Sequence, residues 1–311
     1  MCRQLLLPAS LATILLFTLL TIPAHAEASE LEQHLRDQYQ GKTFLLRGFY
    51  SGDHLRYDAA GTLMDGATSG DWTADGFVQV SSIQVSHERM TIHAKRLFLV
   101  AGAPAGFQFR AAPAPKYAKD KSLDSVKIEA DLAQHNSSDD QADDTLSKIF
   151  LTAKDRLVDL VPDYWKPCIA AGVGGKDEHC AIPPEVLAVP GVLYSPQGDL
   201  DPNSMSAGMG GTPAVVLTHV GGGVSYPKVI NRQDPEYSDA ARQAKFQGVV
   251  ILKVVVDDSG APGRIYILKP LGCGLDAQAV RAVQTWKFDP AEKDGKPLAV
   301  EVAVEVDFHL Y

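Results

Sequence analysis

The sequence is poor in cysteine, in aromatic residues and in positive charge. Its 311 residues include four Cys and 8% aromatic residues, and the formal net charge is -9. An acidic chain has no broad positive field to attract phosphate backbones, so no nucleic acid is expected as a partner. Apolar residues make up 45% of the chain, and glycine and proline are scattered without a period. This composition excludes collagen, a coiled coil and wholesale disorder.

Signatures of catalysis and of cofactor or metal binding are also missing. The sequence has no Gly-x-Ser-x-Gly and no His-Glu-x-x-His, and its nine His form no ligand pattern. The triplet Gly41-Lys42-Thr43 does not complete a phosphate-binding loop, because residue 36 is Arg where that motif needs Gly. We therefore expect a protein that is not an enzyme and that carries no cofactor or metal.

Only one long apolar run is present, from Leu5 to Ile22, and it is followed by the triplet Ala24-His25-Ala26. The small-x-small triplet is typical of a secretory signal, so residues 1–26 are interpreted as a signal peptide. A retained membrane anchor is the alternative, since about 18 largely apolar residues reach the lower length limit for crossing a bilayer. The protein is exported under both interpretations.

Three cysteines remain after this leader. Cys168 and Cys180 enclose a short Gly-rich segment, and in an oxidising compartment we predict a local disulfide between them. A metal cluster that recruits His179 is the minor alternative, because it lacks a fourth ligand. Cys273 lies between two glycines and is interpreted as a small buried residue.

Residues 27–133 are predicted to form a small β-rich domain. Runs such as 75–85 and 89–100 are rich in β-branched and apolar residues and alternate with Gly, Asp and Ser turns. A small antiparallel barrel or sandwich fits this pattern. A short helix is expected at 27–39 and a loop over 101–122.

Two segments separate this domain from the end of the chain. Residues 134–181 are interpreted as a helix running to about Trp165, because apolar residues recur at helical spacing, followed by the cysteine loop. Residues 182–220 are rich in proline and glycine and predict a linker. A flexible linker of this length would let the last domain search for a partner.

Residues 221–311 predict an α+β domain with a three-stranded antiparallel sheet. A first helix is expected to start at Asp234-Pro235, a hairpin to follow over 249–270, and Asp276 to cap a second helix. From Leu298 to Phe308, apolar residues alternate strictly with Ala, Glu and Asp. One face of the last strand is therefore apolar and the other acidic.

Six features follow one another in this domain. They are Tyr237 in the first helix, Gly248 before the first strand, the turn Asp258-Ser259-Gly260, the pair Leu275-Asp276, the run Trp286-Lys287-Phe288-Asp289-Pro290 and the run Asp294-Gly295-Lys296-Pro297. Over about residues 224–311, a quarter of the chain, the sequence resembles the C-terminal domain of TonB-family proteins. The resemblance implies a non-catalytic periplasmic transducer that engages outer-membrane receptors. It also implies that an exposed sheet edge accepts an extended receptor segment as an added strand.

The last strand, from Leu298 to Phe308, is the edge that this resemblance implies. The predicted partner-binding residues are Gln233, Asp234, Tyr237, Leu298, Val300, Glu301, Val302, Glu305 and Asp307. The three acids of the strand would deter unwanted edge pairing and bias the choice of partner, or would simply solvate one face of the sheet. Better-known family members have glutamine where Asp234 stands and proline where Ser238 stands.

The resemblance implies a role in energy-coupled transport, with inner-membrane motor proteins as possible second partners. The leader departs from the family, because Ser10 and His25 are not the Ser–His pair, one helical turn apart, through which members couple to a proton-driven motor. The alternative is a soluble periplasmic structural or adaptor protein that binds other proteins without energy coupling. A retained leader would instead anchor the protein in the inner membrane.

Overall fold

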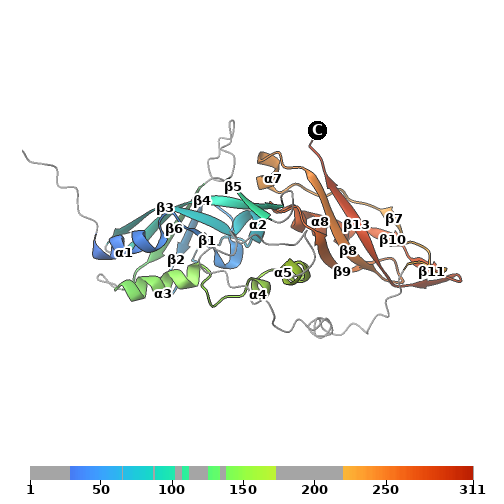
Figure 1. Cartoon of the computed structure of the whole chain (residues 1–311), viewed down its shortest axis with the longest axis horizontal. Helices are drawn as coiled ribbons and strands as arrows, with labels where there is room; N and C mark the ends of the chain where they lie inside the picture. The colour runs from blue at the N-terminus through green and yellow to red at the C-terminus, as the bar shows by residue number, and fades with distance from the viewer. Residues whose placement is uncertain are drawn as a thin grey trace, which may run out of the picture.

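A computed structural model describes residues 29–64, 66–86, 88–101, 107–111, 125–133, 138–172 and 220–310. Two sheets lie end to end along an elongated molecule, with the N-terminal sheet at one end and the C-terminal sheet at the other (Figure 1). The predicted leader, 1–26, and the predicted linker, 182–220, lie outside the described residues except for residue 220. None of the helices in the described part is long and apolar enough to cross a membrane.

The N-terminal sheet has six strands of mixed direction. They are β1 (Thr43–Leu45), β2 (His54–Tyr57), β3 (Phe77–Ser86), β4 (Arg89–Ala101), β5 (Phe107–Ala111) and β6 (Ser125–Asp131). Their order is β1-β3-β4-β6-β2, and β5 pairs with β4. Strands β2 and β6 run parallel, whereas the other neighbours are antiparallel.

The barrel or sandwich expected for residues 27–133 is wrong, because these strands form one open sheet. One face of β4 and β6 carries charged side chains that pair with each other. Arg89 Nε lies 3.0 Å from Asp131 Oδ1, and Lys127 Nζ lies 2.6 Å from Glu129 Oε1. Covering these charges with a second sheet would cost their desolvation, so this part of the face stays open.

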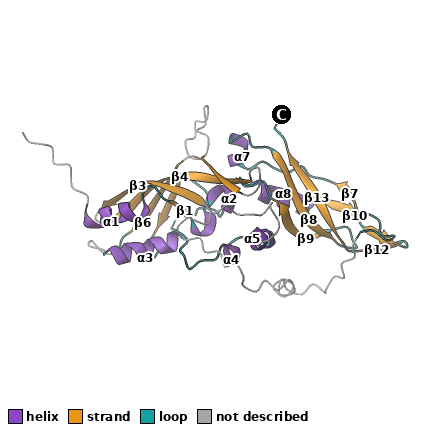
Figure 2. Cartoon of the chain, viewed as in Figure 1, coloured by secondary structure: helices purple, strands orange, loops and turns teal. Residues whose placement is uncertain are grey.

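Two helices, α1 (Glu30–Tyr39) and α3 (Asp139–Ile149), cover the opposite, apolar face (Figure 2). Ser138 starts α3 with a capping box. Helix α1 also protects the outer edge of β3, since the Glu32 carboxylate accepts the backbone N–H of Val85 at 2.8 Å. A side chain that occupies an edge donor deters pairing with another chain.

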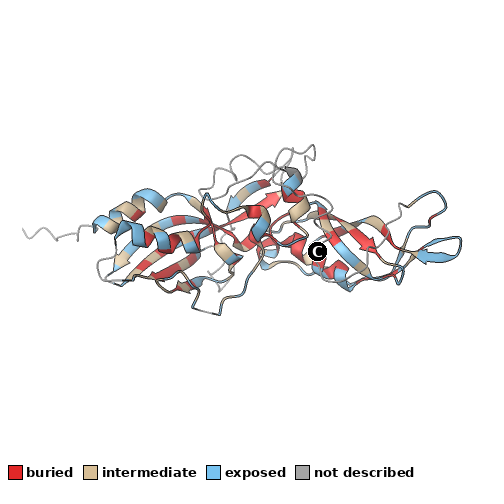
Figure 3. Ribbon diagram, turned by 90° about the horizontal axis from the view of Figure 1, so that it is seen from below, coloured by how far each residue is buried: buried red, intermediate tan, exposed pale blue. Residues whose placement is uncertain are grey.

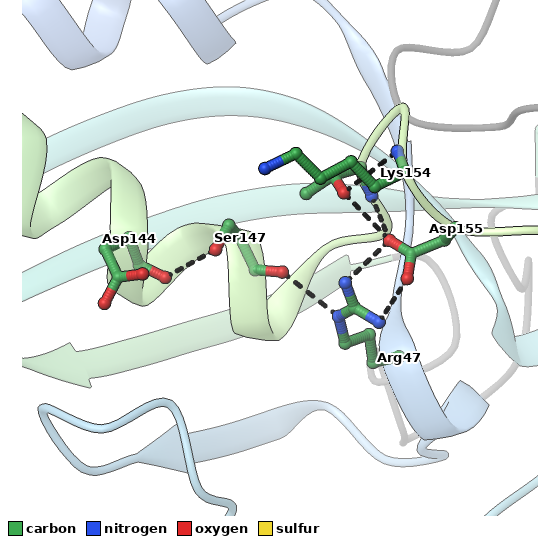
Figure 4. Close-up of polar contacts among 6 residues, drawn as sticks. Arg47, Asp144, Ser147, Lys154 and Asp155 are labelled. Atoms are coloured by element: carbon green, nitrogen blue, oxygen red, sulfur yellow. Dashed lines mark hydrogen bonds and ion pairs between the residues drawn. The ribbon is translucent and has the colours of Figure 1, made fainter.

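The continuous helix predicted to run to Trp165 is interrupted. Helix α3 is followed by two short helices, α4 (Leu157–Leu160) and α5 (Lys166–Gly172). The Arg47 guanidinium donates to the Asp155 carboxylate at 2.8 and 2.6 Å and to a carbonyl at the end of α3 at 3.1 Å (Figure 4). This bidentate pair holds the segment after α3 beside the sheet, where it is not helical.

The loop predicted over 101–122 contains a strand, β5. Its Phe107 is buried, with its ring centroid 6.1 Å from Trp72 and 6.0 Å from Trp165. Trp72 opens the short helix α2 (Trp72–Asp75). The Ala-rich and Pro-rich composition of the segment concealed two phenylalanines at strand spacing.

The C-terminal part confirms the predicted three-stranded antiparallel sheet with helices. Its elements are β7 (Lys228–Asn231), α7 (Asp239–Gln243), β8 (Gly248–Val256), β9 (Pro262–Lys269), α8 (Leu275–Thr285), β10 (Lys287–Asp289), β11 (Ala291–Lys293), β12 (Lys296–Leu298) and β13 (Val300–Phe308). The sheet has the order β13-β8-β9. Two small pairs, β7 with β10 and β11 with β12, accompany it.

The first C-terminal helix starts later than predicted. Helix α7 begins at Asp239 rather than at Asp234-Pro235, because the Ser238 side chain caps it and accepts the N–H of Ala241 at 3.1 Å. The same hydroxyl donates to the Cys273 carbonyl at 2.6 Å. This bond ties the start of α7 to the loop that precedes α8.

Two other details differ from the prediction. Asp276 lies inside α8 and does not cap it; its buried carboxyl accepts the N–H groups of Leu271 and Gly272 at 2.7 Å each. Burial raises the pKa of Asp276 to about 7, although these two hydrogen bonds lower it. Leu298 belongs to the β11–β12 hairpin, which a two-residue Asp-Gly turn closes, so the last strand begins at Val300.

The two sheets share one hydrophobic core, which runs through the middle of the molecule (Figure 3). It joins Trp72, Leu99 and Trp165 of the N-terminal part to Ile267, Leu271 and Leu275 of the C-terminal part. Backbone hydrogen bonds also cross the junction, from Ala101 N to Leu271 O (2.9 Å), from Cys273 N to Leu99 O (2.8 Å) and from Ile267 N to Tyr164 O (3.1 Å). The C-terminal domain is therefore docked against the N-terminal domain, whereas the composition of residues 182–220 predicts a domain that moves freely on a flexible linker.

Gly272→Ala is expected to break this junction. Gly272 has a φ of +82°, and a Cβ there would lie 2.3 Å from the backbone oxygen of Leu99. The matched control is Gly295→Ala, because Gly295 has a φ of +74° but nothing within 4 Å of the added Cβ. In urea unfolding we expect the control to lose about 1 kcal/mol of unfolding free energy and Gly272→Ala about 3 kcal/mol. Equal losses would contradict the close approach.

Candidate functional site

Strand β13 is an edge strand. Its nine residues, from Val300 to Phe308, pair with β8 on one side. No strand among the described residues pairs with the other side. The open side therefore presents backbone N–H and C=O groups without a strand partner, which is the requirement for strand addition.

A groove of about 260 Å³ joins the middle of β13 to the segment around β7, which lies beside β13 in Figure 1. Its lining includes Val302, Ala303, Val304 and Glu305 on β13 and Tyr226, Val229, Arg232, Trp286 and Phe288 on the far wall. Tyr226 is 70% exposed and Val229 is 45% exposed. Large exposed apolar side chains beside an open edge are typical of a protein-binding surface.

Trp286 organises the far wall of this groove. It follows the last turn of α8, and its Nε1 donates to the backbone oxygen of Gln233 at 2.8 Å. The guanidinium carbon of Arg232 lies 5.1 Å from the centroid of its ring, within cation–π distance. Phe288 in β10 pairs with Val229 in β7. The segment before α7 is thus fixed against the end of α8.

The three predicted acids of β13 differ in their surroundings. Glu301 lies 3.1 Å from Lys253 Nζ, and Asp307 lies 2.9 Å from His309 Nε2. Glu305 is exposed, lines the groove and forms no ion pair with the described residues. Glu305 is therefore the acid of β13 that brings a charge without an ion-pair partner among the described residues to the groove.

The predicted partner-binding residues before α7 also differ in their surroundings. The Gln233 side-chain oxygen accepts from the Thr285 hydroxyl at 3.2 Å, and Asp234 is exposed. The ring of Tyr237 packs edge-on against Phe308, the last residue of β13, with centroids 5.5 Å apart. Tyr237 therefore supports the end of the edge strand, whereas Gln233 is held at the end of α8.

The structure brings only part of the predicted set to the groove. Val302 and Glu305 line it, whereas Val300 is fully buried and Leu298 lies in β12. Sequence reasoning missed Arg232 and Tyr226. Their signal was weak, because both precede the first predicted helix and neither belongs to a periodic run.

Neither of the two described cysteines, Cys168 and Cys273, lines this groove. Cys168 is buried and disulfide-bonded, but Cys180 lies outside the described residues, so the pairing of the two stays a prediction. Cys273 is fully buried, which confirms its interpretation as a small buried residue; it is a free thiol, and burial raises its pKa to about 12. Within the described ranges, no group of three or more His, Cys, Asp or Glu could hold a metal ion.

Known proteins resemble this chain in its C-terminal segment. Residues 233–310 match the family model described as Gram-negative bacterial TonB protein C-terminal. Protein tonB2 of Pseudomonas aeruginosa is 40% identical over 77 residues, 24% of this chain and 28% of that protein. Protein TonB of Vibrio cholerae is 30% identical over 89 residues, 28% of this chain and 36% of that protein. A solution NMR structure of the Pseudomonas aeruginosa TonB CTD covers 31% of this chain and 98% of that chain, at 16% identity and a TM-score of 0.23.

The C-terminal segment is thus an α+β domain with an exposed edge strand. By sequence, residues 233–310 are similar to the C-terminal domain of TonB proteins, which confirms the resemblance predicted for about residues 224–311. The chain spans about a third of the length of the curated relatives it matches. The family match begins at residue 233, beyond the N-terminal sheet.

Tyr237→Phe is expected to leave stability unchanged or to raise it slightly. The Tyr237 hydroxyl is buried without a hydrogen-bond partner among the residues described, and burial, with the charge of Asp307, raises its pKa. Its removal ends a desolvation cost. The matched control, Tyr39→Phe, removes a 3.0 Å hydrogen bond to Asp143 and should cost about 1 kcal/mol in urea unfolding. Similar losses in both variants would show that the Tyr237 hydroxyl has a partner in solution.

Proposed function

We propose that the C-terminal domain binds an extended segment of an outer-membrane receptor as an added strand on β13. By this binding the protein supports energy-coupled transport across the outer membrane. The role is binding, not catalysis. The observation that carries the proposal is the open edge of β13, because backbone groups without a strand partner supply affinity that does not depend on the sequence of the added strand.

The other edge of the same sheet is less suitable. In β9 the N–H of Ile267 already donates to the Tyr164 carbonyl at 3.1 Å, and α5 packs against this strand. An added strand there would have to displace part of the N-terminal domain. The docking of the two domains therefore favours β13 as the site of strand addition.

The groove adds recognition of side chains. Val302 and Val304 present an apolar surface beside the open backbone, and Tyr226 extends it on the far wall. Alternate residues of an extended segment point to the same side. A segment with apolar residues at alternate positions therefore fits the groove while its backbone pairs with β13.

The proposed location is the periplasm, the compartment that lies between a receptor in the outer membrane and any motor in the inner membrane. Retention of the leader would anchor the protein and make motor proteins its second partners. The soluble adaptor considered from the sequence has no contact in the described structure in its favour.

A receptor peptide is expected to bind along β13 through its backbone. The test uses the exported chain, a ten-residue peptide copied from the periplasm-facing end of an outer-membrane receptor, and two N-methylated versions, at even or at odd positions. One pattern removes the donors that face β13 and should weaken binding at least tenfold, because several backbone hydrogen bonds are lost. The other pattern should be nearly neutral. Equal effects of both patterns, or NMR shifts confined to residues outside β13, would contradict strand addition.

Glu305→Lys is expected to change the charge preference of the groove. We expect a peptide with one Lys at the groove to bind this variant roughly two- to fivefold more weakly, and a peptide with one Glu to bind it more tightly by a similar factor, because the charge is at an exposed rim. Both effects should shrink in 0.5 M salt. The control is Glu292→Lys, an exposed acid on β11. Matching changes in the control would show a non-specific charge effect.

A further inference from the structure

A second cavity lies where the two domains meet. Its volume is about 360 Å³, and both domains build its walls. Asp71, Asp75 and Arg96 line it from the N-terminal side, and Ser238, Gln278 and Arg281 line it from the C-terminal side. This volume lies within the range of small-molecule sites, which often occur between domains.

The N-terminal wall carries two carboxyl groups, those of Asp71 and Asp75, that form no ion pair with the described residues. Asp71 caps α2 through its Oδ1, which accepts the N–H of Thr73 at 2.8 Å. Its Oδ2 is buried and has no hydrogen-bond partner in the described part of the chain. Asp75 Oδ2 accepts the N–H of Asp71 at 3.2 Å. Burial raises the pKa of both groups, and that of Asp75 reaches about 6.

Arg96 donates no hydrogen bond to either carboxyl group, although its charge lowers the pKa of Asp75. It is 2% exposed, and its guanidinium donates to the backbone oxygens of Asp75, Tyr50 and Gly52 at 2.6, 2.9 and 2.7 Å. These bonds hold the loops that form the cavity wall. Asp71 Oδ2 therefore still lacks a hydrogen-bond donor among the described residues.

The opposite wall offers a free positive charge. Arg281 lies on α8, is exposed and forms no ion pair with the described residues. Its charge lowers the pKa of Asp71, so the two groups are close enough to interact across the cavity. Buried carboxyl groups thus lie on the N-terminal wall, and the C-terminal wall carries the Arg281 guanidinium together with the exposed carboxylate of Asp239.

We propose that this interdomain cavity binds a small zwitterion, an amino acid or a dipeptide, with its cationic nitrogen at Asp71 and Asp75 and its carboxylate at Arg281. The nitrogen supplies the donor that the buried carboxyl groups lack, and charge-assisted hydrogen bonds are the stronger kind. The ligand touches both walls, so it stabilises the docked arrangement of the domains. This site is separate from the groove at β13.

Ligand variants test both ends of the zwitterion. Full-length exported protein is titrated by calorimetry with glycine, L-alanine and L-alanyl-L-alanine, and with N-acetylglycine and glycinamide, which lack the cationic nitrogen and the carboxylate respectively. At least one zwitterion should bind and raise the thermal unfolding midpoint as its concentration rises. The two blocked compounds should bind at least tenfold more weakly than the best of the three zwitterions or not at all. Tighter binding of L-alanine or of L-alanyl-L-alanine identifies the free amino acid or the peptide as the source.

Protein variants locate the binding. Asp75→Asn and Arg281→Gln should each weaken binding of the best zwitterion at least tenfold, and Arg281→Gln changes an exposed residue, so the fold is retained. The controls Asp289→Asn and Lys287→Gln change exposed residues of β10 and should stay within twofold of the parent. No binding of any zwitterion at 20 mM, where an amino-acid site would be detectable, would overturn the proposal. Equal affinity in Arg281→Gln and in the controls would overturn it as well.

Discussion

The contact between the end of β4 and the loop before α8 is the constraint on which the rest of the structure depends. Three consecutive residues of this loop, Gly272, Cys273 and Gly274, have positive φ angles of 82°, 54° and 76°. The left-handed backbone conformation costs a residue with a side chain, such as Cys273, about 1 kcal/mol. The N–H of Cys273 donates to Leu99 O across the junction. The Asp276 carboxyl accepts the N–H groups of Leu271, just before these residues, and of Gly272, the first of them. The loop is therefore shaped for contact with β4 and not only for the start of a helix.

This contact determines which edges of the C-terminal sheet are available. The N-terminal domain lies against β9 and the start of α8, whereas β13 lies on the far side of β8. A strand added to β13 would extend the sheet away from the junction. A force applied to that added strand would be transmitted first through the hydrogen-bonded ladder between β13 and β8 and then to the shared core. The ladder joins nine residue pairs from Val300 to Phe308.

The sequence predicts what is local and periodic in this molecule. Alternation from Val300 to Phe308 is strong enough to identify the last strand and its register, because a slip of one residue would expose every valine of the apolar face. The first and last residues of the strands were harder to predict, because Leu298 continues the alternation but pairs in a different hairpin. Contacts between residues far apart in the chain produce no periodic pattern in the sequence, so the sequence did not predict them. The pair between Arg47 and Asp155 joins residues 108 positions apart and interrupts a helix that spacing alone predicts. Likewise, alternation indicates strands but not that β2 and β6 pair in parallel.

Helix α8 connects the junction loop, the interdomain cavity and the groove beside β13. Its first turn holds the junction loop through Asp276, its middle presents Arg281 to the interdomain cavity, and Trp286 follows its end at the groove beside β13. Eleven residues of α-helix span about 16 Å and behave as a rigid element. A ligand in the cavity changes affinity at β13 only if it prefers one position of α8 over another. If it does, linkage requires that a strand on β13 changes the affinity of the cavity by the same factor, so the cavity would report on the occupancy of the edge.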